Sequence, residues 1–136
     1  MKSITYSIPG NPVSWKRAGH SNGSFYDAQK HAKIGYALLI QNQHGSTKQF
    51  EGPLLLEITF YFPMPASLKK KHELMRHNPH YYKPDLDNLI KYICDTCNEL
   101  LYKDDCLISK IVATKVYSDE GKTEFTITEL NEATKI

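Results

Sequence analysis

Hydrophobic and polar residues alternate with a period of two near the start of the chain. In residues 2–8, Ile4, Tyr6 and Ile8 are separated by Ser or Thr, which predicts a half-buried strand. A longer alternation in residues 54–62 places a large apolar side chain at every second position and ends at Pro63. We expect this second segment to be a central strand of a sheet.

The end of the chain contains two further strand-like segments, residues 106–117 and 123–130. They are joined by Asp119-Glu120-Gly121-Lys122, a short polar connection that contains glycine. Such a connection between two strands is typical of a β-hairpin, so we expect the two segments to pair with each other.

Helical spacing of apolar residues occurs in three other segments. Residues 28–43 have this spacing at Ile34, Leu38 and Leu39, and Gly45 follows where a helix commonly ends. A short helix is expected from Ser67, as its cap, to Arg76. The strongest pattern begins near Asp87, and its apolar residues form a single stripe. The stripe consists of Leu89, Ile90, Ile93, Cys94, Cys97, Leu100 and Leu101.

The order of these elements is strand, helix, strand, helix, helix, strand, strand. This order predicts an α+β fold, with residues 1–136 forming a single domain in which helices pack on one face of a mixed β-sheet. Residues 13–27 are rich in Ser, Gly and Asn, and we expect them to form a long loop.

Composition and charge are those of an ordinary globular protein. The chain is 40% hydrophobic and 24% charged, which argues against a disordered, fibrous or membrane protein. The net charge of +2 does not by itself indicate a nucleic-acid partner. No segment approaches the roughly 20 apolar residues that span a bilayer, and the first residues lack the pattern of a signal peptide. Three cysteines, an odd number, favour reduced thiols, so we expect a cytoplasmic location.

The most informative segment for chemistry is an acidic helix start. Asp85 and Asp87 lie two residues apart where the third helix begins, so both can point to a common position. Mg²⁺ prefers oxygen ligands and commonly takes only one or two carboxylates. At about 100° per residue, Asp87 shares a helix face with Lys91, Asp95 and Asn98, away from the apolar stripe.

A further acidic pair, Asp104-Asp105, precedes the next strand. If tertiary folding brings this pair to the helix start, three carboxylates and an amine would surround one point. They could then bind a metal, activate water and stabilise a phosphodiester during hydrolysis. The alternative is structural, with Asp87 capping the helix, Asp85 favouring the helix dipole, and Asp104-Asp105 serving as turn residues. An EF-hand fits poorly because Leu89 and Ile90 stand where its loop needs glycine and oxygen ligands.

These motifs resemble the signature of the RusA family of Holliday junction resolvases. The resemblance consists of Lys83-Pro84-Asp85-Leu86-Asp87-Asn88-Leu89-Ile90-Lys91, then Asp95, then Tyr102-Lys103-Asp104-Asp105-Cys106-Leu107-Ile108. Pro9-Gly10-Asn11-Pro12 and the basic loop that ends in Phe25-Tyr26-Asp27 are also similar to the family. The resemblance therefore covers nearly the whole chain.

The resemblance implies a crossover junction endodeoxyribonuclease, an enzyme that hydrolyses phosphodiester bonds with the help of Mg²⁺. It implies that Asp85, Asp87 and Asp105 hold the metal ion and that Lys91 is the essential amine. Members of the family act as homodimers that cut a four-way junction symmetrically, so the expected partners are branched DNA and a second copy of the chain.

Basic and aromatic residues near the acidic segment are candidates for DNA contact. The basic candidates, which could bind backbone phosphates, are Lys16, Arg17, Lys69, Lys70, Lys71, Arg76 and Lys83. The aromatic candidates, which could stack on exposed bases, are Trp15, Phe25, Tyr26, Tyr81 and Tyr82. A solvated lysine face and ordinary loop aromatics are the alternative. The Cys94-x-x-Cys97 pair is assigned to core packing because both thiols fall on the apolar stripe.

Three functions remain open from the residues alone. The first is the magnesium-dependent nuclease described above. The second is a protein that binds DNA junctions without cutting them, and the third is a magnesium-dependent phosphoesterase that acts on small substrates. A protein that only binds DNA would gain nothing from carboxylates near phosphate unless a cation lay between them. A small-molecule enzyme would need a closed pocket, and it would have no need for the exposed lysines.

Overall fold

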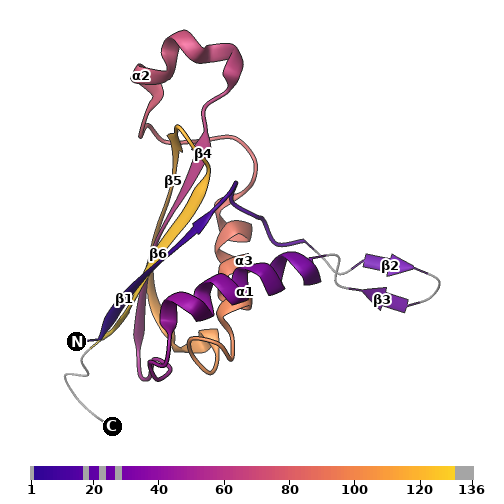
Figure 1. Ribbon diagram of the computed structural model, residues 1–136, viewed down its shortest axis with the longest axis vertical. Coiled ribbons are helices and arrows are strands. Elements are labelled where there is room, and N and C mark those ends of the chain that lie inside the picture. The colour runs from indigo at the N-terminus through magenta and orange to yellow at the C-terminus, as the bar shows by residue number, and fades with distance from the viewer. Residues whose placement is uncertain (1, 17–18, 22–23, 27–28, 131–136) are drawn as a thin grey trace.

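A four-stranded mixed sheet forms the centre of the part of the protein that the structure describes (Figure 1). The structure is a computed structural model that describes residues 2–16, 19–21, 24–26 and 29–130. The spatial order is β1-β6-β4-β5, in which β4 runs parallel to β5 and antiparallel to β6. The strands are β1 (Ser3–Pro9), β4 (Leu54–Pro63), β5 (Ile108–Ser118) and β6 (Lys122–Glu129). The predicted mixed sheet and the central position of residues 54–62 are both confirmed.

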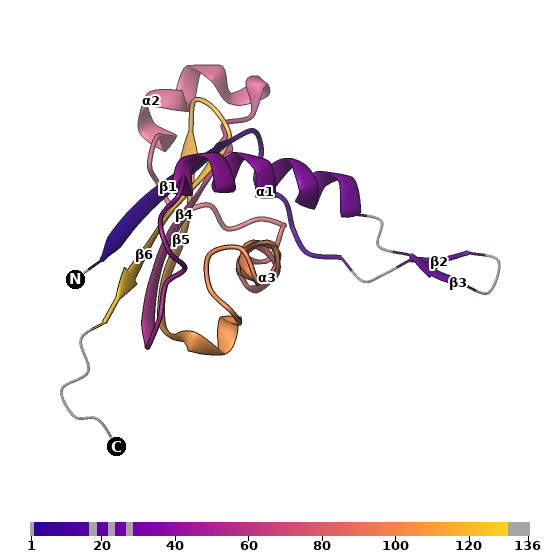
Figure 2. The same cartoon turned by 60° about the horizontal axis from the view of Figure 1, so that its bottom comes forward.

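Helices α1 (Lys30–His44) and α3 (Leu86–Cys97) lie against the same face of this sheet (Figure 2). The apolar side chains of β4 that alternate in the sequence are buried on that face, and they form the core with residues of α3 and β6. The end of α1 is fixed to β1 by a buried hydrogen bond of 2.6 Å between the Tyr6 hydroxyl and Nδ1 of His44. The α+β fold with helices on one face is thus confirmed.

The residues that α3 buries belong largely to the predicted apolar stripe. Leu89, Tyr92, Ile93 and Cys97 are buried, and all three cysteine thiols of the chain are free, which confirms that the Cys-x-x-Cys pair packs in the core. The helix ends at Cys97, earlier than the stripe suggested. Glu99 has a positive φ of 66°, a conformation that does not continue a helix, and the chain turns there toward β5.

The prediction that residues 106–117 and 123–130 pair as a hairpin is wrong. β5 and β6 are consecutive in sequence, but β4 lies between them. β6 has a strand on each side and buries Phe125 and Ile127, whereas β5 is at the edge of the sheet. The connection between them packs closely against the end of β1: Gly10 N donates to Gly121 O at 3.1 Å. A Cβ at Gly121 would lie 2.8 Å from the Cα of Asn11, so this approach requires glycine.

The long loop expected for residues 13–27 is interrupted by a small hairpin, so this prediction is also wrong. β2 (Gly19–Ser21) pairs antiparallel with β3 (Ser24–Tyr26). The sequence between them is Asn22-Gly23, the dipeptide that most favours a two-residue hairpin connection, and this signal could have predicted the pairing.

Two details of the predicted helices also need correction. Ser67 does not cap a helix: a 3₁₀ helix, η1 (Ala66–Lys71), begins after Pro65 and continues into the short α2 (His72–Met75). In α1 the helix is confirmed, but Ile34, Leu38 and Leu39 are exposed. The helix contacts the core through Ile40 and the half-buried Tyr36 instead. None of the helices in the described residues has the length and apolar character needed to cross a bilayer.

Candidate active site on helix α3

The candidate carboxylates Asp85 and Asp87 lie where α3 begins. Asp85 is the N-cap residue, with extended backbone angles, and its side chain makes no capping hydrogen bond. Asp87 is in the first turn and is exposed. The structural alternative, in which Asp87 caps the helix, is therefore wrong. Carboxylates at this end are favoured by the positive end of the helix dipole. Asp87 Oδ1 accepts a hydrogen bond from Asn88 N at 2.9 Å, which satisfies one backbone N–H of the first turn.

Lys91 lies one helical turn after Asp87, on the same exposed face of α3. Its Nζ is 3.9 Å from the centroid of the Trp15 ring, a cation–π contact. Trp15 is held there by a 2.9 Å hydrogen bond from its backbone N to Asn88 O. Trp15 therefore holds the Lys91 ammonium against the helix that begins at the acidic pair. Its predicted stacking on DNA bases stays a prediction.

Gln29 holds the segment that carries Trp15 in place. Its Oε1 accepts from Lys16 N at 3.0 Å, and its Nε2 donates to Ser14 O at 2.7 Å. Gln29 is buried, so both hydrogen bonds are partly shielded from water. The loop after β1 is consequently fixed against α3 where it passes Lys91.

The loop that leads into α3 is fastened to β5 by Lys115, a residue that the sequence analysis missed. Lys115 Nζ donates to Tyr82 O at 2.7 Å and to Pro84 O at 2.8 Å. In the same loop, Lys83 Nζ lies 3.0 Å from Oδ1 of Asp85, two residues later in the chain. Nothing in the local sequence marks Lys115, because its partners are backbone carbonyls about 30 residues away.

Asp105 lies beside the C-terminal half of α3, at the start of the 3₁₀ helix η2 (Asp105–Leu107). Burial raises the pKa of the Cys94 thiol to about 11, and the negative charge of Asp105 contributes to this rise. Asp105 therefore belongs to an element that packs against α3, the helix that begins beside Asp85 and Asp87.

Asp104 has a structural role. Its carboxylate accepts a hydrogen bond from Cys106 N at 3.1 Å, and hydrogen bonds of this kind hold its pKa below the ordinary value. Asp104 is the cap of η2, as the structural alternative proposed for this pair. Asp105, the neighbour predicted to be a metal ligand, does not have this capping role.

Among the residues that the structure describes, no three His, Cys, Asp or Glu side chains are arranged to hold a metal ion. The convergence of Asp85, Asp87 and Asp105 on one point therefore stays a prediction. Asp95, on the same helix, lines a cavity of about 250 Å³ between α1 and α3 together with Lys30 and Lys33.

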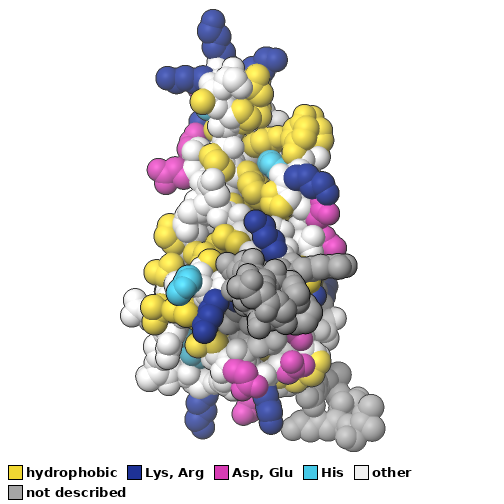
Figure 3. Space-filling model, turned by 90° about the vertical axis from the view of Figure 1, so that its right-hand side faces the viewer, with side chains coloured by type: hydrophobic (Ala, Val, Ile, Leu, Met, Phe, Trp, Pro, Cys, Tyr) yellow, Lys and Arg dark blue, Asp and Glu magenta, His cyan; other side chains and the backbone are white. Residues whose placement is uncertain are grey.

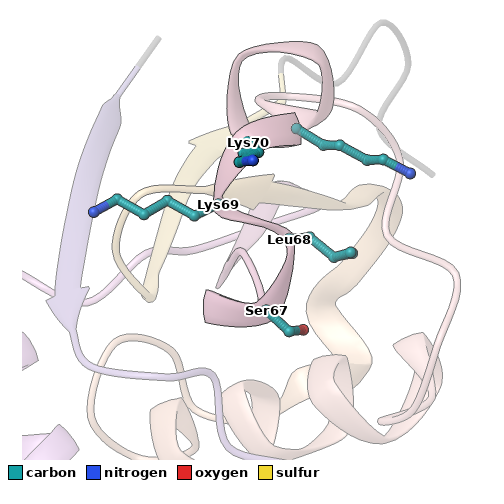
Figure 4. Close-up of a pocket in the computed structure, with 5 residues that line it drawn as sticks. Ser67, Leu68, Lys69 and Lys70 are labelled. Atoms are coloured by element: carbon teal, nitrogen blue, oxygen red, sulfur yellow. The ribbon is translucent and has the colours of Figure 1, made fainter.

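The predicted basic residues fall into two groups. Lys69, Lys70 and Lys71 are exposed on η1, at the end of the molecule where Lys and Arg side chains gather in Figure 3. Figure 4 shows Lys69 and Lys70 pointing in different directions from this helix. Arg76 is instead engaged by Asp119, with N–O distances of 2.8 and 3.2 Å. Lys16 is exposed, and Arg17 lies outside the described residues.

The sequence pattern of one protein family, described as endodeoxyribonuclease RusA, matches residues 9–128. The chain belongs to the RusA family. The match extends from the end of β1 almost to the end of β6, and it includes all of α3 and η2.

The chain is also similar to two individual proteins. The chain is 33% identical over 110 residues to the crossover junction endodeoxyribonuclease rusA of Lactococcus phage r1t, covering 78% of each chain. It is 31% identical over 147 residues to the uncharacterized protein YqaN of Bacillus subtilis (strain 168), covering 96% of this chain and 99% of the relative. The RusA-like chain thus spans nearly the full length of one relative and most of the other.

Proposed function

We propose that this RusA-family protein is a magnesium-dependent endonuclease that resolves Holliday junctions and related branched DNA by paired cleavage. Membership of the family supports DNA-junction cutting as the activity. One observation supports assigning this activity to particular residues. Asp85 and Asp87 are exposed at the start of α3, and Lys91 lies one turn away on the same face.

The donor set fits Mg²⁺. Asp85 and Asp87 offer hard oxygen atoms at the protein surface, and Mg²⁺ commonly binds one or two carboxylates and completes its shell with water and substrate phosphate. In the proposal Asp105 is the third ligand. When bound, the ion supplies a polarised water and neutralises charge on the phosphate.

Two lysines would act on the phosphate. Lys91, held over the Trp15 ring, places a positive charge where a phosphodiester approaching Asp87 gains negative charge in the transition state. Lys83 neutralises Asp85 in the DNA-free protein. Asp85 would hold the metal ion in the active protein, and the Lys83 amine would then be available to bind the DNA backbone.

Paired cuts require two such sites, so the proposal includes a homodimer. Each subunit carries one candidate site, and a two-fold axis would present two sites to opposite strands of a junction. The outward-facing Ile34, Leu38 and Leu39 of α1 provide exposed apolar surface of the kind that subunits bury. Sedimentation of the wild-type protein would measure its oligomeric state.

The central experiment compares labelled four-way junctions, flaps and linear duplex, each with and without Mg²⁺. We expect paired nicks that are confined to the junction and that require the metal ion. Asp87→Asn should abolish cutting but leave junction binding intact or stronger, because removing one negative charge eases the approach of phosphate.

Glu57→Gln is the matched control, since it removes one exposed carboxylate from β4, on the face of the sheet away from the core. It should cut like the wild type. Cutting by the Asp87→Asn protein would contradict the assignment of the site. Tight junction binding without any cutting by the wild type would favour a protein that binds branched DNA but does not cleave it.

A further inference from the structure

Two adjacent tyrosines form an exposed aromatic pair immediately before the acidic helix start. Tyr81 is 77% exposed and Tyr82 is 62% exposed. Their rings stack on each other with centroids 4.7 Å apart and planes inclined by 26°. Aromatic rings gain considerable free energy when they are buried, so a pair left in water at this place indicates a binding surface.

The pair is held rigidly, although it lies in a loop. Lys115 fixes the backbone at Tyr82 O, and His80 N donates to Lys115 O at 3.0 Å. The His80 ring stacks on Phe62, with centroids 4.2 Å apart, and meets Tyr82 edge-on at 6.2 Å. Because the rings are oriented before any ligand arrives, little conformational entropy is lost on binding.

The pair lies between positive charge and the candidate carboxylates. On one side it shares a cavity of about 290 Å³ with Leu68 of η1, the helix that carries Lys69, Lys70 and Lys71. On the other side, Lys83 follows Tyr82 directly and bonds Asp85. Figure 3 shows hydrophobic side chains exposed below the basic end of the molecule. A ligand that binds both the lysines and the tyrosine rings has anionic groups and flat aromatic faces. This is the chemistry of a nucleic acid with exposed bases.

We propose that Tyr81 and Tyr82 form a stacking platform for an unpaired nucleobase at the branch point of DNA, beside the phosphate that is cut. The assignment of branched DNA rests on the proposed function. In an intact duplex the bases are stacked on each other, whereas a branch point can present a base at low cost. The platform therefore favours branched over linear DNA, while the lysines bind the backbone of either.

The test uses the Asp87→Asn protein, so that the DNA stays intact, at one fixed salt concentration. Four-way junctions carry the fluorescent base 2-aminopurine next to the branch point, and a linear duplex of the same sequence is the reference. We expect binding to change the fluorescence of the junction probe. Tyr81→Ala combined with Tyr82→Ala should abolish this change and weaken junction binding about tenfold or more, the usual effect of removing stacked aromatic residues. Duplex affinity should stay within about twofold.

Two further pairs of variants separate stacking from other roles. Tyr81→Phe with Tyr82→Phe keeps both rings and should retain junction affinity and the fluorescence change. Tyr81→Leu with Tyr82→Leu keeps apolar bulk without an aromatic face and should lose both, even if the alanine protein folds poorly. Dissociation of a dimer by the leucine pair would overturn the inference in favour of a contact between two copies of the chain.

The remaining outcomes distinguish this inference from the proposed function. One outcome is that the wild type cuts junctions while the tyrosine variants bind them, and change the 2-aminopurine fluorescence, as the parent protein does. In that case only the stacking platform is overturned. If the wild type cuts nothing but the fluorescence change depends on the tyrosines, the nuclease proposal fails and the base-binding platform stands. An equal loss of duplex and junction affinity would also overturn the platform.

Discussion

Lys115→Met tests whether the loop before α3 is held in position by its hydrogen bonds to Lys115 of β5. The substitution keeps a long apolar stem and removes an ammonium that donates to Tyr82 O and Pro84 O at 2.7 and 2.8 Å. Hydrogen bonds from charged donors contribute about 1.5–3 kcal/mol each when well shielded. The bond to Tyr82 O is exposed to solvent and the bond to Pro84 O is partly buried, so the total should be lower than two such bonds. We expect a loss of about 2 kcal/mol in the free energy of unfolding.

Urea unfolding measures this loss. With a denaturant slope of about 1–3 kcal/mol per molar, the midpoint should fall by about 1 M. The matched control is Lys110→Met, which removes an exposed lysine from the same strand. Within the described residues, the side chain of Lys110 makes no hydrogen bond or ion pair, so its removal should change stability by less than about 0.5 kcal/mol.

The same variant should also reduce junction cutting. Asp85 follows Pro84 directly, and a displacement of about 1 Å in a reacting group can cost about 100-fold in rate. We expect Lys115→Met to cut at least tenfold more slowly under conditions in which it is fully folded. If Lys115→Met and Lys110→Met unfold at the same urea concentration and cut equally well, the idea that Lys115 positions the acidic loop is refuted.

Two other predictions concern charge. Replacing Lys69, Lys70 and Lys71 together by alanine should lower the dependence of log affinity on log salt by about 0.9 per lost phosphate contact, measured by duplex binding at several salt concentrations. An unchanged slope would show that these exposed lysines do not touch DNA. Burial, with the nearby Lys115 charge, lowers the pKa of His80 below its ordinary value, so the unfolded chain takes up this proton more readily than the folded protein. Stability should therefore fall as the pH drops through about 6.5, and urea unfolding of His80→Phe at pH 7.5 and 5.5 should show a smaller fall than the wild type does.

The errors in the sequence analysis share a physical origin. The connection at residues 119–122 correctly marked a reversal of the chain, but it could not show that β4 enters between β5 and β6. Strand pairing is decided by contacts between distant segments. The apolar alternation of one strand is compatible with more than one neighbouring strand. The outward position of Leu38 has the same cause, because the spacing of α1 predicts a helix but not which face the sheet covers.

Local pattern alone determined the elements and the candidate chemistry of this chain. The alternation of β4, the stripe of α3 and the pair Asp85 and Asp87 depend on residues close in sequence, where backbone geometry fixes which side chains share a face. Tertiary structure alone decided that the Lys91 ammonium lies over the Trp15 ring, that Lys115 fastens the acidic loop and that Tyr81 and Tyr82 are exposed together. The first two contacts join segments about 30 to 75 residues apart, and the third depends on how a loop is held. Periodicity in a sequence relates only residues that are close together in the chain, so it cannot predict such contacts.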